Sequence, residues 1–263
     1  MQTERHADNP VLKRLGRLAA VSAIALAVVA CSEEQETGST TPAVSTEQTA
    51  STEGAPAAQS VEVAQADTGT ATEAVEAPPS TGSVDMEAVM EEGPLPEMAI
   101  GEANAPVTVV EYMSLTCPHC ADFHTETFEA VKEKYVDTGQ VRFVVRDFPF
   151  DPRAAAGAML ARCAPEGQYF PMIKTLFEQQ QNWATAEDAR TALMQISRMA
   201  GFTQENFETC LTNQQLLDDV NAVRQKAAEE FEVQSTPTFI INGERYAGNM
   251  SIDQMSAIID SML

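Results

Sequence analysis

Two cysteines separated by two residues are the part of this 263-residue chain most able to do chemistry. They are the ends of the tetrapeptide Cys117-Pro118-His119-Cys120. Two thiols at this spacing can close a small disulfide ring and reopen it through thiolate attack, so the spacing favours dithiol–disulfide exchange. We expect Cys117 to be the nucleophile and Cys120 to be the resolving thiol.

The tetrapeptide lies between a predicted strand and a predicted helix, and this position supports the assignment. At a helix N-terminus, unpaired N–H groups and the helix dipole favour a thiolate on Cys117. Pro118 suits the first helical turn because its missing N–H is not needed there. His119 adds positive charge or a hydrogen-bond donor beside the sulfur, which lowers the pKa of Cys117 below the free value of about 8.5.

Other uses of two cysteines at this spacing fit the chain poorly. Zinc needs about four ligands, yet the histidines are His6, His119 and His124, and no second such motif exists. Covalent haem attachment needs a histidine where Ala121 stands, and a purely structural disulfide in so small a loop would constrain little of the unfolded chain. We therefore expect no metal and no cofactor. We expect His124 to be a surface or packing residue and not a catalyst.

The elements around the tetrapeptide predict an α/β fold. A β-branched strand, a helix and a second strand in series imply a parallel pair with a crossover helix. A long helical stretch follows, and the pattern ends with a hairpin signalled by Asn242-Gly243 and a closing helix. The predicted order is β-α-β, a helical insertion, then β-β-α, with elements at 107–113, 121–135, 141–148, 152–230, 238–241, 244–246 and 251–263.

Four stretches of the chain together resemble the DsbA-like thiol–disulfide oxidoreductases. The resemblance implies a thioredoxin fold interrupted by a helical domain, which we place at 94–263 with the insertion at about 152–230. The stretches are 105–112, with Ala105-Pro106-Val107 and Glu111-Tyr112, then Cys117-Pro118-His119-Cys120, Arg146-Asp147-Phe148-Pro149 and Ser235-Thr236-Pro237-Thr238.

The resemblance also implies roles for three residues outside the tetrapeptide. Glu111 matches a buried acid that accepts or relays the Cys120 proton; the alternative is an ordinary polar residue on a half-exposed strand. Pro237 matches a cis-proline that faces the active-site disulfide. That geometry would bring Thr236 beside the Cys117 sulfur, where its hydroxyl can donate a hydrogen bond.

Two further cysteines, Cys163 and Cys210, both fall in the helical insertion. In an oxidising compartment we expect them to pair as a structural disulfide. The alternative is two separate buried thiols.

The N-terminus indicates export. Three basic residues precede an apolar run at 18–30, whose helical length of roughly 20 Å is too short for a bilayer core of roughly 30 Å. Residues 1–31 are therefore predicted to be a signal peptide. Its end resembles the bacterial lipoprotein signal, in which Cys31 becomes the lipidated N-terminus; ordinary cleavage after Ala30 is the alternative.

Residues 32–93 carry 13 acidic and no basic side chains and no aromatic residue. Such a segment cannot bury enough apolar surface to offset its conformational entropy, so we predict a disordered acidic tether. It would hold the domain away from a membrane or serve as a spacer of no required length. The net charge of −23 argues against nucleic acid and against adhesion to an anionic membrane surface.

These observations predict an extracytoplasmic dithiol oxidase that donates its disulfide to reduced exported proteins. By resemblance, a quinone-linked membrane protein would restore the disulfide, and no diffusible cofactor would take part. The expected location is the bacterial periplasm or cell envelope, with a lipid anchor as the membrane contact. A Thr at 236 is similar to isomerases and some oxidases, so an isomerase or reductase is one alternative. A binding or chaperone lipoprotein with an incidental dithiol is another.

Overall fold

The computed structural model of the protein describes residues 75–263. The predicted signal peptide, the candidate lipidation site Cys31 and the part of the predicted tether at 32–74 lie outside these residues. Among the helices of residues 75–263, none combines the length and the apolarity needed to span a membrane.

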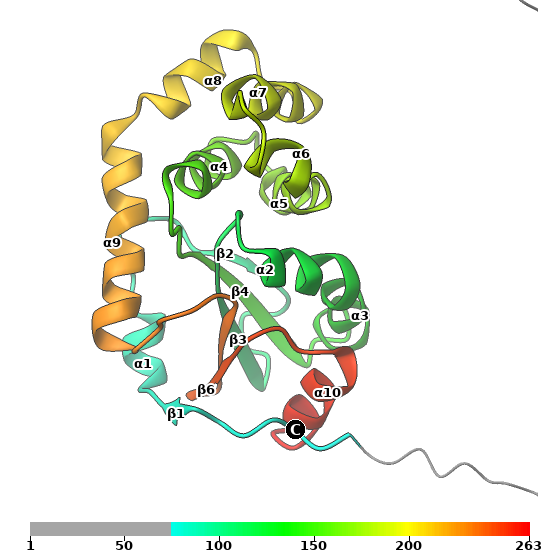
Figure 1. The fold of residues 1–263 in the computed structure, drawn as a ribbon. Coiled ribbons are helices and arrows are strands. Elements are labelled where there is room, and N and C mark those ends of the chain that lie inside the picture. The colour runs from blue at the N-terminus through cyan, green and yellow to red at the C-terminus, as the bar shows by residue number, and fades with distance from the viewer. Residues whose placement is uncertain (1–74) are drawn as a thin grey trace, which may run out of the picture. The chain divides into compact units, whose positions relative to one another are not determined.

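A six-stranded mixed sheet lies at the centre of the fold (Figure 1). β3 and β4 are neighbours and run parallel, as the β-α-β pattern predicts, while every other neighbouring pair is antiparallel. Asn242-Gly243 joins β5 to β6 in the predicted hairpin. In hydrogen-bonded order the strands are β1 (Gly82–Ser83), β6 (Glu244–Ala247), β5 (Thr238–Ile241), β3 (Val107–Met113), β4 (Val141–Asp147) and β2 (Met98–Ile100).

β3 has an inner position in this sheet, and its composition explains why. Every residue of β3 except Thr108 is buried, and β-branched side chains pack well on a pleated surface that is covered from both sides. Val109 pairs with Phe143 of β4 on one side and with Ile241 of β5 on the other. The end of β3, which leads directly to Cys117, is therefore held by strands on both sides.

Different helices cover the two faces of the sheet (Figure 1). On one face, Phe123 and Phe128 of the crossover helix contact Phe239 and Phe143, with ring centroids 4.7 and 5.1 Å apart. That helix is α2 (Pro118–Asp122) and α3 (Phe128–Val131), each followed by a π-helical turn, at Phe123–Thr127 and Lys132–Val136. α10 (Ile252–Asp260) lies on the same face, and α1 (Met86–Met90) and the end of α9 (Gln214–Glu230) cover the other.

The helical insertion lies between β4 and β5, where the sequence predicts it. Its core includes Trp183, which is fully buried and donates its indole N–H to the carbonyl of Leu176 at 2.8 Å. Cys163 and Cys210 are joined in a disulfide that connects the end of α4 to α8. The helices are α4 (Pro152–Arg162), α5 (Tyr169–Glu178), α6 (Gln180–Ala184), α7 (Ala189–Met199), α8 (Gln204–Leu211) and α9.

The packed part of the chain begins before residue 94, although the sequence predicts a disordered tether up to residue 93. β1 pairs with β6, β2 closes the opposite edge on β4, and Val89 of α1 is fully buried against one face of the sheet. The prediction of disorder is therefore wrong for residues 82–90. Elements of two and five residues have no periodicity to detect, and they form here because distant strand edges and an apolar sheet face offer them partners.

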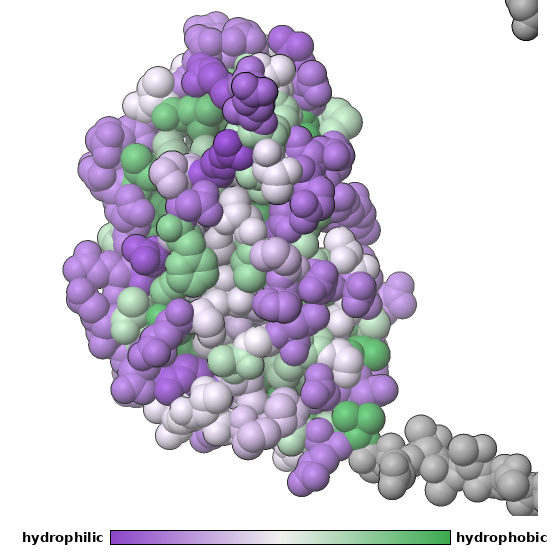
Figure 2. All heavy atoms as spheres, in the orientation of Figure 1, coloured by the Kyte–Doolittle hydropathy of each residue, from purple (hydrophilic) through white to green (hydrophobic). Residues whose placement is uncertain are grey.

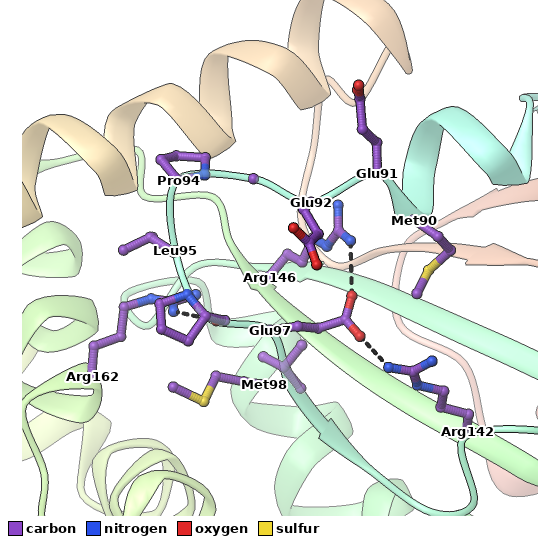
Figure 3. A pocket seen from close by; sticks show the side chains of 13 residues that line it. Met90, Glu91, Glu92, Pro94, Leu95, Glu97, Met98, Arg142, Arg146 and Arg162 are labelled. Atoms are coloured by element: carbon purple, nitrogen blue, oxygen red, sulfur yellow. Dashed lines mark hydrogen bonds and ion pairs between the residues drawn. The ribbon is translucent and has the colours of Figure 1, made fainter.

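Residues 82–100, which include β1, α1 and β2, form an N-terminal arm, and Glu97 connects this arm to β4 through ion pairs (Figure 3). Its carboxylate accepts hydrogen bonds from Arg142 and from Arg146, the latter at 3.2 Å. Arg162 of α4 donates to the carbonyl of Pro96 at 3.0 Å. A cavity of roughly 690 Å³ lies between the arm and β4, and no cysteine lines it. The cavity is therefore separate from the dithiol. Two of the arginines that line it, Arg142 and Arg146, are already paired with the Glu97 carboxylate.

The arm can be tested at Val89. Val89→Ala removes two methyl groups from a fully buried site, so the free energy of unfolding should fall by about 2 kcal/mol. Urea denaturation followed by circular dichroism measures this change. Glu87→Ala, on the exposed side of the same helix, is the control and should change the value by less than about 0.5 kcal/mol. A Val89→Ala variant as stable as this control would mean that α1 does not belong to the folded domain.

Candidate active site

Cys117 is the residue immediately before helix α2. Its backbone is extended (φ −78°, ψ 120°), and Pro118 occupies the first turn of the helix. The N–H groups of His119 and Cys120, which the helix leaves without backbone partners, help to lower the pKa of Cys117. The predicted position of the nucleophile at a helix N-terminus is therefore the observed one.

These surroundings lower the pKa of Cys117 to about 5. The largest cause is the hydrogen bond from the Cys120 thiol, followed by the side chain of Thr236 and the backbone N–H groups of Cys120 and His119, while burial acts in the opposite direction. Each of these donors interacts more strongly with a negative sulfur than with a neutral one. Cys117 is therefore a thiolate at neutral pH.

Cys120 has the opposite character. It is fully buried, and burial raises its pKa well above the ordinary value, with further contributions from the hydrogen bond to Cys117 and the negative charge of Glu111. Cys117 is only partly buried, and both cysteines are free thiols in this structure. One accessible thiolate beside one buried, protonated thiol can carry out ordered attack and resolution.

The peptide bond between Thr236 and Pro237 is cis, and this turn lies against the nucleophile. The Cys117 thiol donates to the carbonyl oxygen of Thr236 at 3.1 Å. The family resemblance predicts that the Thr236 hydroxyl donates to the sulfur. In the thiol form this hydroxyl is buried and has no hydrogen-bond partner, yet the Thr236 side chain contributes to the lowered pKa of Cys117. The hydroxyl is thus available to the thiolate.

Two contacts from the helical insertion hold the loop before Cys117. The side-chain amide of Gln180 donates to the carbonyls of Leu115 and Cys117, both at 2.9 Å. Thr116 donates to the Asp151 carboxylate, which also caps the start of α4. Sequence reasoning missed Gln180 and Asp151 as site residues, because one polar side chain in a helical pattern gives no sign of a partner about 65 residues away.

Glu111 and His124 form a buried pair beneath the dithiol. Glu111 is fully buried on β3, which excludes the half-exposed alternative. Its Oε2 lies 2.9 Å from Nε2 of His124, whose ring stacks on Phe177 with centroids 4.5 Å apart. His124 is therefore a packing residue, as expected, but it is also the partner of the buried acid, which the sequence did not suggest.

His119 points away from the dithiol. Its side chain is 71% exposed, and its Nδ1 lies 3.6 Å from the Asp122 carboxylate. The contribution of this residue to the Cys117 thiolate is its backbone N–H and not the predicted ring. Within residues 75–263, no three His, Cys, Asp or Glu side chains converge in an arrangement that could hold a metal ion.

Comparison with known proteins gives a consistent result. Residues 95–261 match a family model described as thioredoxin. The chain is 34% identical over 168 residues to a candidate protein-disulfide oxidoreductase of Rickettsia conorii, a match that covers 64% of this chain and 60% of that protein. The matched region thus spans about 60% of the length of such curated relatives.

Solved structures extend the comparison to the fold. The crystal structure of alpha-DsbA1 from Wolbachia pipientis is 30% identical in sequence, with a TM-score of 0.60, and the match covers 65% of this chain and 92% of that one. BdbD from Bacillus subtilis is 20% identical with a TM-score of 0.58, over 72% of this chain and 98% of that one. The second likeness is one of fold alone.

The reactivity of Cys117 tests this description of the site. Iodoacetamide should alkylate Cys117 with an apparent pKa near 5, while Cys120 remains unmodified in the folded protein. Mass spectrometry of samples quenched between pH 3 and 9 measures both rates. Cys120→Ala removes the largest stabilising hydrogen bond, so it should raise the apparent pKa of Cys117. Equal rates at both thiols, or a Cys117 pKa near the free value of about 8.5, would contradict the assignment.

Proposed function

This chain belongs to the thioredoxin family, among its DsbA-like members, and we propose that it is an extracytoplasmic protein-disulfide oxidoreductase that donates the Cys117–Cys120 disulfide to reduced exported proteins. The observation that carries the proposal is the contrast between the two thiols. Cys117 is a thiolate with a pKa of about 5, and the pKa of buried Cys120 is raised. The similarity to the rickettsial candidate oxidoreductase supports the same reaction.

The reaction proceeds in two exchanges. A substrate thiolate attacks the Cys117 sulfur, the bond to Cys120 breaks, and Cys120 leaves with the electron pair and takes up a proton. A second substrate thiolate then attacks the substrate sulfur of the mixed disulfide and expels Cys117 as a thiolate. The substrate loses two electrons and the site gains them. Of the two substrate protons, one ends on Cys120 and one in solvent.

The stability of the Cys117 thiolate supports the oxidising direction. A thiol with a low pKa is a good leaving group, so the second exchange is fast when Cys117 departs. Interactions that stabilise only the reduced site make the corresponding disulfide a stronger oxidant. Because the hydrogen bonds to Cys117 favour its charged form, they act on the reduced site in this way.

The surface beside the dithiol suits an extended peptide. The backbone at Thr236, next to the cis bond, lies beside the Cys117 sulfur, and a substrate segment can pair with such a backbone as a short strand. Phe150 is half exposed and directly precedes Asp151, which accepts a hydrogen bond from Thr116. Figure 2 shows hydrophilic side chains around the rim of this view and more apolar ones in its middle, between α9 and α2. We propose that reduced, incompletely folded chains bind there.

We also propose where the protein acts and which kind of protein reoxidises it. A signal peptide at 1–31 with lipidation at Cys31 would place the domain in the periplasm or cell envelope. A quinone-linked membrane protein would then return Cys117 and Cys120 to the disulfide. Both suggestions come from the sequence signal and the family resemblance.

The oxidase assignment is tested with a reduced peptide that carries two cysteines. The oxidised protein should convert it to its disulfide form, and Cys117→Ser should abolish this activity. Cys120→Ser, mixed with the disulfide form of the peptide, should instead accumulate a mixed disulfide at Cys117, because the Cys120 thiol that would resolve it is absent. Gel electrophoresis under non-reducing conditions detects this adduct.

Scrambled ribonuclease separates the oxidase from its alternatives. Efficient reshuffling of scrambled ribonuclease, together with failure to oxidise the reduced peptide, would replace the oxidase with an isomerase. Inactivity in both assays would favour the binding or chaperone lipoprotein.

The anchor is tested at Cys31. The wild-type protein expressed with its own N-terminus should partition into the detergent phase, and Cys31→Ser should release it into the aqueous phase or block its processing. Phase separation followed by immunoblotting measures the distribution. Wild-type protein found wholly in the aqueous phase would rule out lipidation while leaving the dithiol chemistry untouched.

A further inference from the structure

Glu111 and His124, the buried pair beneath the dithiol, leave one of the two Glu111 carboxylate oxygens without a hydrogen bond. Of the two carboxylate oxygens of Glu111, Oε2 is bonded to Nε2 of His124, while Oε1 is buried and has no partner within residues 75–263. A buried carboxylate oxygen without a donor is costly. Oε1 of Glu111 is therefore free to accept a proton from a neighbouring group.

Cys120 is a neighbour that requires such an exchange. It is fully buried, and the negative charge of Glu111 contributes to its raised pKa. In every cycle Cys120 must gain a proton when the disulfide is reduced and lose it when the disulfide forms. Because solvent does not reach Cys120, an internal acceptor is needed.

We propose that His124 is a positioning residue for this exchange: it holds Oε2 of Glu111, and so keeps Oε1 free to take the proton of Cys120 during disulfide formation and to return it during reduction. The inference rests on the proposed function. One proton lies between Oε2 and Nε2 at their separation of 2.9 Å. The carboxyl group therefore cannot rotate without breaking that hydrogen bond.

The surroundings of His124 fix its ring. It stacks on Phe177 of α5 with an interplanar angle of 20° and also contacts Phe123 and Phe128 on its own helix. Its side chain is 3% exposed. Aromatic neighbours offer no competing acceptor, so Glu111 is the polar group that orients the ring.

The other ionisable groups near the pair are already engaged or neutral. Tyr169 of α5 is buried, and burial raises its pKa well above the ordinary value. Asp147 of β4 is paired with Arg162 of α4. At the exposed rim, Lys174 of α5 pairs with Glu129 of α3, and His119 and Asp122 of α2 lie 3.6 Å from each other with exposed side chains.

Release of glutathione from its mixed disulfide isolates the step. Oxidised glutathione reacts with the reduced full-length protein at Cys117. Cys120 then passes its proton to Oε1 of Glu111 and its sulfur attacks the Cys117 sulfur. The bond to glutathione breaks, and the departing glutathione thiolate takes a proton from solvent. Rapid acid quench and mass spectrometry at pH 5 to 9 follow the release rate.

The variants separate positioning from packing. His124→Phe keeps an aromatic ring on Phe177 but loses the hydrogen bond. It should slow release by roughly 10²-fold at pH 7, with a rate that rises about tenfold per pH unit, because solvent base must replace Glu111. His124→Gln, whose amide can still donate to Oε2, should restore most of the rate. Glu111→Gln should be as slow as His124→Phe, and the double variant no slower than Glu111→Gln alone.

The outcomes that overturn the proposal are distinct from failure of the oxidase assignment. If His124→Phe keeps the wild-type release rate and pH profile, His124 acts only through packing. The same conclusion follows if the decreases in release rate caused by His124→Phe and Glu111→Gln are fully additive in the double variant. If His124→Phe does not fold, His124→Asn, whose amide is too short to reach Oε2, takes its place with the same expectations. If the wild type forms no mixed disulfide with glutathione at Cys117, the proposed function itself fails.

Discussion

The hydrogen bonds received by the Cys117 sulfur at the start of α2 are the interaction on which the site depends. The buried Cys120 thiol, the Thr236 side chain and backbone N–H groups of the first helical turn together lower its pKa to about 5. The helix holds the backbone groups in place, while the Cys120 thiol becomes a donor only when the disulfide is reduced. The same stabilisation is absent when Cys117 is bonded to Cys120, and this difference is the basis of the oxidising direction that we propose.

Much of the remaining structure keeps this arrangement in place. β3 ends just before the loop, and its pairing with β4 and β5 fixes where the helix starts. Gln180 and Asp151 tie the loop to the helical insertion, while the cis bond at Pro237 brings a backbone carbonyl against the sulfur. The insertion is thus a support for the active-site loop as well as a cover over one end of the sheet.

The elements with strong local signals were predictable from the sequence. β3, β4 and the hairpin at Asn242-Gly243 have β-branched runs and turn residues that act locally, and the tetrapeptide defines its own chemistry. β1 and β2 were not predictable, because strands of two and three residues form only on edges created by distant parts of the chain.

The missed contacts of the site have a similar cause. The hydrogen bond from Gln180 to Cys117 spans 63 residues, and the one between His124 and Glu111 spans 13. The type of residue at either position does not indicate which residue it will contact. The position of Pro237 followed from family resemblance, since one proline in a loop does not by itself indicate a cis bond. Local propensity therefore predicts the elements, and only the tertiary fold determines which side chains meet.

The stability of the reduced protein relative to the oxidised one, measured as a function of pH, tests the central claim most directly. A Cys117 pKa of about 5 in the folded state, against about 8.5 when unfolded, means that unfolding takes up a proton between those values. The free energy of unfolding of the reduced form should therefore rise from pH 4 to pH 8 relative to that of the oxidised form, whose Cys117 does not titrate. A difference between the two forms that stays constant over this range would contradict the account.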